Sequence, residues 1–306
     1  MNGTARAEVR MLPDGRRLHL QDGPIDLVVE ATGTPAAVVG AYRAAAARFR
    51  FVLDELCAEL AELRAPAGSK PRRFRGAAAR RMEAAVAPHA GDAFITPMAA
   101  VAGAVADDIL AAMRHAAADG LTRISVNNGG DIALWLAPGE ATTVGLVSRP
   151  DRPALFARAR LAAEDGIGGI ATSGAPGRSF SLGVADAVTI LASCAAEADA
   201  AATVVANAVD LPGDARVERR PARSLQPDSD LGDRLVTRGV APLDAGSVAL
   251  ALDRGLAAAR PLIARGAIAA AALHLQGVTR VASRDRRLMA LEAPQTGIIL
   301  REPLDA

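Results

Sequence analysis

The sequence Val126 to Ile132, VNNGGDI, ends an apolar run with two asparagines, two glycines and an aspartate, and it is read here with Gly168 to Gly174, GGIATSG. Glycine reaches positive φ angles and lets another backbone segment or a ligand approach closely. The same Asn-Asn-Gly-Gly run is also typical of a tight turn between two strands. On these residues alone, both a ligand-binding corner and a plain turn stay open.

Composition limits the classes of protein that the chain can belong to. Its 306 residues are 51% hydrophobic and only 3% aromatic, so we expect one domain over residues 1–306 with a core of Ala, Val, Leu and Ile. The formal net charge of +1 gives no electrostatic reason to expect binding to nucleic acid or to an anionic membrane. Charged residues interrupt every alanine-rich run, so no membrane span is expected. The polar N-terminus lacks the apolar stretch of an export signal, which predicts a cytoplasmic protein.

The chain has two cysteines, and both lie in apolar segments. Cys57 and Cys194 are expected to be buried free thiols, as unpaired cysteines usually are. Residues 65–76, APAGSKPRRFRG, hold the only lysine and a cluster of arginines. This segment can be a solvated loop, or an arginine clamp for a ligand that carries phosphate, since arginine binds oxyanions through two parallel hydrogen bonds.

Hydrophobic spacing predicts helices and strands along most of the chain. Thr34 and Pro35 are typical of a helix start, and apolar residues then recur at steps of three and four until about Arg64. Strands that mostly follow one another, bracketed by helices, predict an α+β fold with an antiparallel sheet and long helices packed on one side. The recurring order of hairpin, helix, helix and hairpin suits a pseudo-duplicated fold. Strands are expected at 16–20, 25–31, 121–126, 131–136, 142–147, 168–172, 187–192, 267–276 and 278–283; helices at 77–87, 95–115, 196–209 and 244–265; and an irregular excursion at 212–242.

Four pieces of the chain, in order, resemble the ApbE family of FAD:protein FMN transferases. GAVAD, Gly103 to Asp107, resembles the family's glycine followed four residues later by aspartate, and VNNGGDIAL resembles its glycine-containing strand-turn-strand. ATSG, Ala171 to Gly174, resembles its threonine-serine-glycine turn, and VTILASCAAEADAAAT, Val188 to Thr203, its final strand and helix. The resemblance covers residues 94–210 and leaves residues 243–306 as a closing helix and hairpin. The chain is thus similar to a divergent branch of the family.

The resemblance implies a T-fold-like architecture and a flavin site with a magnesium ion. Asp199 and Thr203 would be the metal ligands; four residues apart on a helix, they share one face. Magnesium prefers oxygen ligands and is usually held by one or two carboxylates with phosphates and water. Without the resemblance, the same pair is an ordinary polar stripe on a helix. The residues implied to line the flavin nucleotide are Asp107, Asn128, Gly129, Gly130, Asp131, Thr172, Ser173 and Gly174.

The chain departs from the family pattern at two places. Ala102 occupies the position of the family's lysine, and a short stretch, 175–187, replaces the segment that carries the family's histidine. The four histidines, His19, His89, His115 and His274, are expected to be ordinary structural residues, so no catalytic residue is assigned.

Two functions follow from the resemblance and the departures. The first is a Mg-dependent transfer of FMN from FAD to a hydroxyl of an acceptor protein. The second is a non-catalytic module that binds a flavin, pterin or purine. A third interpretation, an assembly partner with a purely structural glycine turn, also stays open. A homodimer is expected by analogy with T-fold proteins.

Overall fold

The computed structural model describes residues 6–68, 70–117, 119–147, 155–177, 179–285, 287–288 and 290–291. The chain divides into two compact units. The first comprises Met1–Ala141, Ala162–Ala171 and Ser193–Asp199, and the second Thr142–Leu161, Thr172–Ala192 and Ala200–Ala306. Each is described here by itself. Within the described residues, no helix is both long and apolar enough to cross a membrane. The single-domain expectation stays a prediction.

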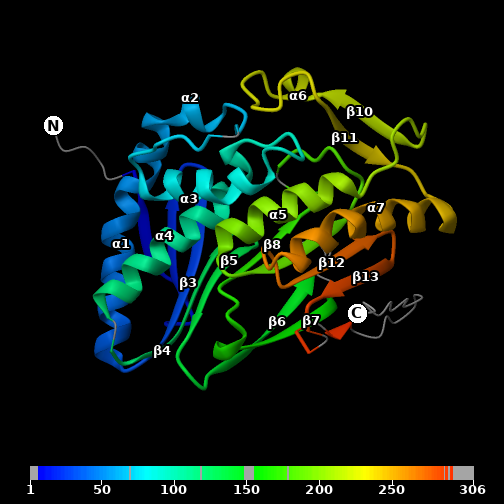
Figure 1. Ribbon diagram of the computed structural model, residues 1–306. Helices are drawn as coiled ribbons and strands as arrows, with labels where there is room; N and C mark the ends of the chain where they lie inside the picture. Colours follow the sequence, from blue (N-terminus) through cyan, green and yellow to red (C-terminus); the bar gives the residue numbers. More distant parts are fainter. Residues whose placement is uncertain are drawn as a thin grey trace. The chain divides into compact units, whose positions relative to one another are not determined.

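The first unit holds an antiparallel sheet with helices packed against it. The sheet order is β1-β2-β3-β4-β5-β8, with adjacent strands antiparallel. Helices α1 and α4 pack against each other and against strands of this sheet, and Figure 1 shows them over β3 and β4. The elements are β1 (Glu8–Met11), β2 (Leu18–Asp22), β3 (Ile25–Gly33), α1 (Pro35–Ala58), α2 (Leu60–Leu63), α3 (Ala77–Val86), η1 (Ala87–His89), η2 (Pro97–Ala100), α4 (Val101–Ala116), β4 (Leu121–Asn128), β5 (Asp131–Leu136), η3 (Ala163–Asp165) and β8 (Gly169–Ser173).

The second unit contains three small groups of strands and the helix α7. Strands β9, β12 and β13 form one antiparallel group in that order, and α7 packs on β12 and β13. The elements are β6 (Ala141–Val147), β7 (Leu155–Ala162), β9 (Ala187–Ala192), α5 (Ala195–Ala208), β10 (Val217–Pro221), α6 (Ala222–Leu225), β11 (Leu235–Val240), α7 (Ala245–Ala264), β12 (Ala270–Leu275), β13 (Val278–Ser283) and β14 (Ala290–Leu291). The first residues of α5 belong to the first unit.

The α+β class and the antiparallel sheet are confirmed, and most expected elements are found. Thr34 caps α1 as predicted, because its hydroxyl accepts a hydrogen bond of 3.4 Å from the amide of Ala37. The helix expected to run to Arg64 ends at Ala58, since Glu59 leaves the helical conformation before α2 begins. T-fold topology and pseudo-duplication stay predictions.

Two expectations from the sequence are wrong. Residues 212–242 are not merely irregular, because they hold the antiparallel pair β10–β11 and the short helix α6. Cys57 is not buried but exposed, whereas Cys194 is partly buried. The buried side of α1 includes Val52 and Leu56, and one further residue turns the chain about 100° away from that side. Cys57 therefore faces away from the core.

Candidate functional site

The glycine turn closes a hairpin in the first unit. Strands β4 and β5 pair so that Asn128 lies opposite Asp131, with Gly129 and Gly130 between them. The two glycines have φ angles of 67° and 118°, and the amide of Gly130 donates a 2.8 Å hydrogen bond to Oδ1 of Asn127. A φ of 118° is restricted almost entirely to glycine. No described atom lies within 4 Å of where a Cβ of Gly130 would be, so the tip of the turn is open.

Asn128 connects the hairpin to the start of α4. Its side chain is buried, and Nδ2 donates a hydrogen bond of 3.1 Å to the carbonyl oxygen of Ala102. Ala102 therefore interacts through its backbone at the position where the related transferases carry a lysine.

Asp107 caps the N-terminus of α5. One carboxylate oxygen accepts a hydrogen bond of 3.0 Å from the amide of Ala195, and the other accepts one of 2.9 Å from Ala196. Both donors belong to the first turn of the helix, where amides have no partner within the helix and a negative charge is favourable. Burial raises the pKa of Asp107, and the two amide donors oppose that effect. This carboxylate holds α5 against α4; its contact with a flavin stays a prediction.

Gly103 permits that approach. A Cβ on Gly103 would lie 2.2 Å from the carbonyl oxygen of Ala195 and 2.8 Å from the amide nitrogen of Ala196. Both neighbours are backbone atoms, which cannot rotate away as a side chain can. Gly103 and Asp107 are four residues apart and share a face of α4, so the GAVAD pattern is explained by one helix contact.

Asp199 lies on the first turns of α5, next to this contact. Its Oδ2 accepts a 3.0 Å hydrogen bond from the amide of Gly103. Burial raises the pKa of the Asp199 carboxyl well above its ordinary value, and the negative charge of Asp131, at the start of β5, raises it further. Two carboxylates that disfavour each other's ionisation are stabilised together by a cation. The structure thus brings Asp199 to the strand end that carries the glycine turn.

The oxygen atoms of Asp131 and Asp199 suit a hard divalent cation. Among the described residues, no group of three His, Cys, Asp or Glu side chains is placed to hold a metal ion. Magnesium commonly takes only one or two carboxylates and completes its shell with phosphate oxygens and water. These residues therefore fit a magnesium ion that is bound jointly with a phosphate, and they do not fit a site built entirely of protein ligands.

The remaining candidate residues belong to the second unit. Thr172 Oγ1 lies 2.8 Å from Thr189 Oγ1 on β9, and Ser173 is partly buried at the end of β8. A Cβ on Gly174 would lie 2.4 Å from the carbonyl oxygen of Asp186, so close packing accounts for this glycine. Thr203 is partly buried on α5, one turn after Asp199. Participation of these four residues in the site stays a prediction.

Sequence reasoning missed why two glycines begin GGIATSG. A Cβ on Gly168 would lie 2.3 Å from the carbonyl oxygen of Ser193, and one on Gly169 would lie 2.1 Å from the carbonyl carbon of Cys194. The start of β8 is therefore packed directly against the residues that lead into α5. A pair of glycines before a strand is the only signal of this contact in the sequence.

The fold and site define a class of α+β protein in which a glycine hairpin, a capped helix start and a buried aspartate meet. Residues 9–281 match the family described as AbpE bacteria. The chain belongs to this family, an ApbE-like branch, which confirms the resemblance found in the sequence.

Several archaeal proteins and one solved structure are similar to the chain. The UPF0280 protein MK0206 of Methanopyrus kandleri is 40% identical over 113 residues, which are 37% of this chain and 43% of that protein. A UPF0280 protein of Methanoregula boonei is 40% identical over 161 residues, 51% of this chain and 63% of that protein. The matches span about half the length of such relatives. The apo form of the Pseudomonas stutzeri flavinyl transferase ApbE aligns over 94% of each chain, with 13% identity and a TM-score of 0.44.

Proposed function

We propose that this protein binds a flavin nucleotide together with Mg²⁺ at the cluster formed by the glycine turn, Asp131 and Asp199. The observation that carries the proposal is the buried Asp199 carboxylate, which is fixed by the amide of Gly103 and faces the charge of Asp131. A cation between these groups removes the unfavourable interaction, and a pyrophosphate supplies the ligands that the protein lacks. Membership of the ApbE-like family supports a flavin as the nucleotide.

The residues have separable roles in this proposal. Asp131 and Asp199 hold the ion, with Thr203 as the further ligand that the family resemblance implies. Asn128 and Asp107 fix the start of α4 and of α5. Gly129 and Gly130 leave the tip of the turn open for the nucleotide, and Thr172, Ser173 and Gly174 contribute by resemblance alone. Magnesium would neutralise negative charge on the pyrophosphate of FAD.

Two outcomes of binding are proposed, and the chain's departures separate them. In the first, FMN passes from FAD to an acceptor protein's hydroxyl and AMP is released, as in the transferases that the family resembles. In the second, the flavin, or a pterin or purine in its place, is held without reaction. Ala102 favours the second outcome, because it offers only a methyl group where the transferases have lysine.

Calorimetry with FAD, with and without Mg²⁺, tests the shared step. We expect Mg-dependent binding that Asp199→Asn and Asp131→Asn each weaken at least tenfold. Asp92→Asn, which changes an exposed aspartate in the same unit, is the matched control and should bind like the wild type. Failure of the wild type to bind FAD under either condition would overturn the proposal.

AMP release in the presence of FAD, Mg²⁺ and candidate acceptor proteins then distinguishes the two outcomes. Release that depends on Asp199 supports the transferase. Tight binding without AMP supports the binding module.

A further inference from the structure

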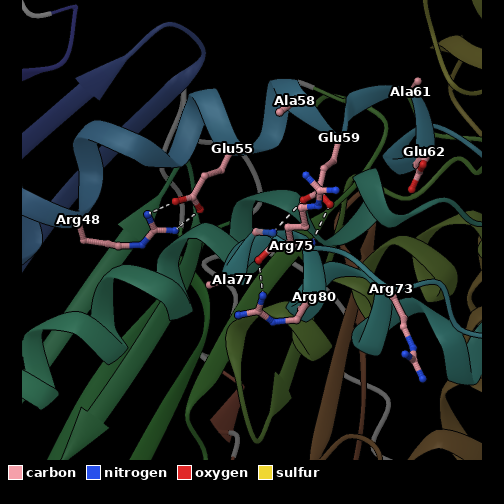
Figure 2. A pocket seen from close by; sticks show the side chains of 11 residues that line it. Arg48, Glu55, Ala58, Glu59, Ala61, Glu62, Arg73, Arg75, Ala77 and Arg80 are labelled. Carbon is pink, nitrogen blue, oxygen red and sulfur yellow. Dashed lines mark hydrogen bonds and ion pairs between the residues drawn. The ribbon is translucent and has the colours of Figure 1, made fainter.

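A second group of arginines lines a cavity that the proposed flavin site does not use. The cavity has a volume of about 900 Å³ and lies among the last turns of α1, helix α2, residues 73–76 and the first turn of α3 (Figure 2). Four arginines and three glutamates line it, with three alanines between them. This volume is in the range of small-molecule sites.

The glutamates of the cavity are largely committed to the protein. Glu55 pairs with Arg48 through both carboxylate oxygens. Glu59 accepts hydrogen bonds of 2.7 Å and 2.9 Å from the backbone amides of Arg75 and Gly76. These bonds satisfy the two carboxylates and fix the loop that leads into α3. They leave the guanidinium groups of the loop without acidic partners.

Three arginines next to this loop keep donors that can bind a ligand. Within the described residues, no carboxylate pairs with Arg73, Arg75 or Arg80. Arg80 donates from Nη1 to the carbonyl oxygen of Arg75, which places these two residues side by side, as Figure 2 shows, and leaves the other donors of Arg80 unused. A guanidinium has five donors in a fixed plane and matches phosphate oxygens in pairs.

The loop that carries the arginines is anchored from below. Phe74 is buried, so its neighbours Arg73 and Arg75 are directed away from the core and are exposed. Arg72 binds the buried carboxylate of Glu83 through its backbone amide and its side chain, and it also stacks on Phe74 at 5.6 Å. Anchoring of this kind lowers the entropy that a ligand would lose by ordering the loop.

We propose that this cavity binds a phosphorylated small molecule of nucleoside-diphosphate size. The phosphate oxygens contact Arg75 and Arg80, with Arg73 at the edge, and the remainder of the ligand lies over Ala58 and Ala61. The site is separate from the Asp131–Asp199 cluster and needs no metal ion. The sequence left residues 65–76 open between a solvated loop and an arginine clamp, and this inference favours the clamp.

Calorimetry with ADP in EDTA tests the inference independently of the flavin site. We expect the double variant Arg75→Ala/Arg80→Ala to bind ADP at least tenfold more weakly, since each charge-assisted bond accounts for about that factor. The matched control is Arg43→Ala, an exposed arginine earlier on α1, which should bind ADP like the wild type. Asp199→Asn should also leave ADP binding unchanged.

Competition identifies the part of the ligand that is recognised. Pyrophosphate should displace ADP, and adenosine should not. The inference is overturned if the wild type binds neither ADP nor pyrophosphate, if the double variant binds ADP normally, or if Arg43→Ala or Asp199→Asn weakens binding equally. Displacement by adenosine as strong as that by pyrophosphate would also overturn it. Thermal melting of each variant confirms folding, and Arg80→Ala alone serves if the double variant unfolds.

Discussion

Replacing Gly103 by alanine tests whether the close contact of α4 with α5 builds the site. The new methyl group would begin 2.2 Å from the carbonyl oxygen of Ala195 and 2.5 Å from its carbonyl carbon. Ordinary contacts of this kind are above 3 Å, so the start of α5 must move by about 1 Å or α4 must bend. Either movement also lengthens the 3.0 Å hydrogen bond from the Gly103 amide to Asp199.

The expected cost follows from three opposing contributions. Overpacking of a well-packed contact costs about 1–3 kcal/mol. Part of a hydrogen bond to a charged group, worth about 1.5–3 kcal/mol in full, is lost as well. Alanine in place of glycine in a helix returns about 1 kcal/mol. We therefore expect Gly103→Ala to lower the free energy of unfolding by about 2 kcal/mol, which corresponds to a fall in Tm of several degrees.

Urea unfolding followed by circular dichroism measures this difference, and Gly40→Ala is the matched control. Gly40 lies inside α1, where a Cβ would meet only the Cβ of Ala117 at 3.9 Å, an ordinary contact. There the substitution should stabilise the protein by up to about 1 kcal/mol. The same chemical change should thus have opposite signs in two helices of one unit. A Gly103→Ala protein as stable as the wild type would refute the role assigned to this contact.

Three further predictions concern other parts of the first unit. Asp107→Asn should lower the free energy of unfolding by about 1–3 kcal/mol, because an amide group replaces one of two buried acceptors with a donor that faces a backbone N–H; urea unfolding measures it, and an unchanged midpoint would contradict the cap. At pH 8, iodoacetamide should label the exposed Cys57 and spare Cys194, whose pKa burial and the nearby charge of Asp107 raise to about 12. The neutral thiol is the unreactive form, so mass spectrometry that finds equal labelling of both cysteines would exclude this environment. Glu83→Gln should cost about 3 kcal/mol, since it leaves Arg72 without its buried ion pair; in a double-mutant cycle with Arg72→Ala, additive effects would show that the pair is not coupled.

The sequence predicts best those features that depend on local pattern. The helical period of α1, the cap at Thr34 and the hairpin around Gly277 follow from residues close together in the chain, and the structure contains all three. The Asn-Asn-Gly-Gly run likewise predicts a turn between strands, because positive φ angles are a local requirement. The pair β10–β11 was missed since its strands are short and rich in arginine and proline, which gives no alternation to detect.

The roles of residues within the site depend on contacts that no local pattern contains. Gly103 and Asp107 are visible in the sequence as residues of one helix face, but their spacing does not say what lies opposite. The structure supplies that element, the start of α5, and thereby explains why one position has no side chain and the other a carboxylate. Asp199 follows from the same contact, because its oxygen is fixed by the amide of a residue that must itself be glycine for the helices to approach. A family resemblance can assign all three residues to a ligand. The geometry assigns two of them to bringing the third into position, so their substitution should be measured first as a change in stability and only then as a change in flavin binding.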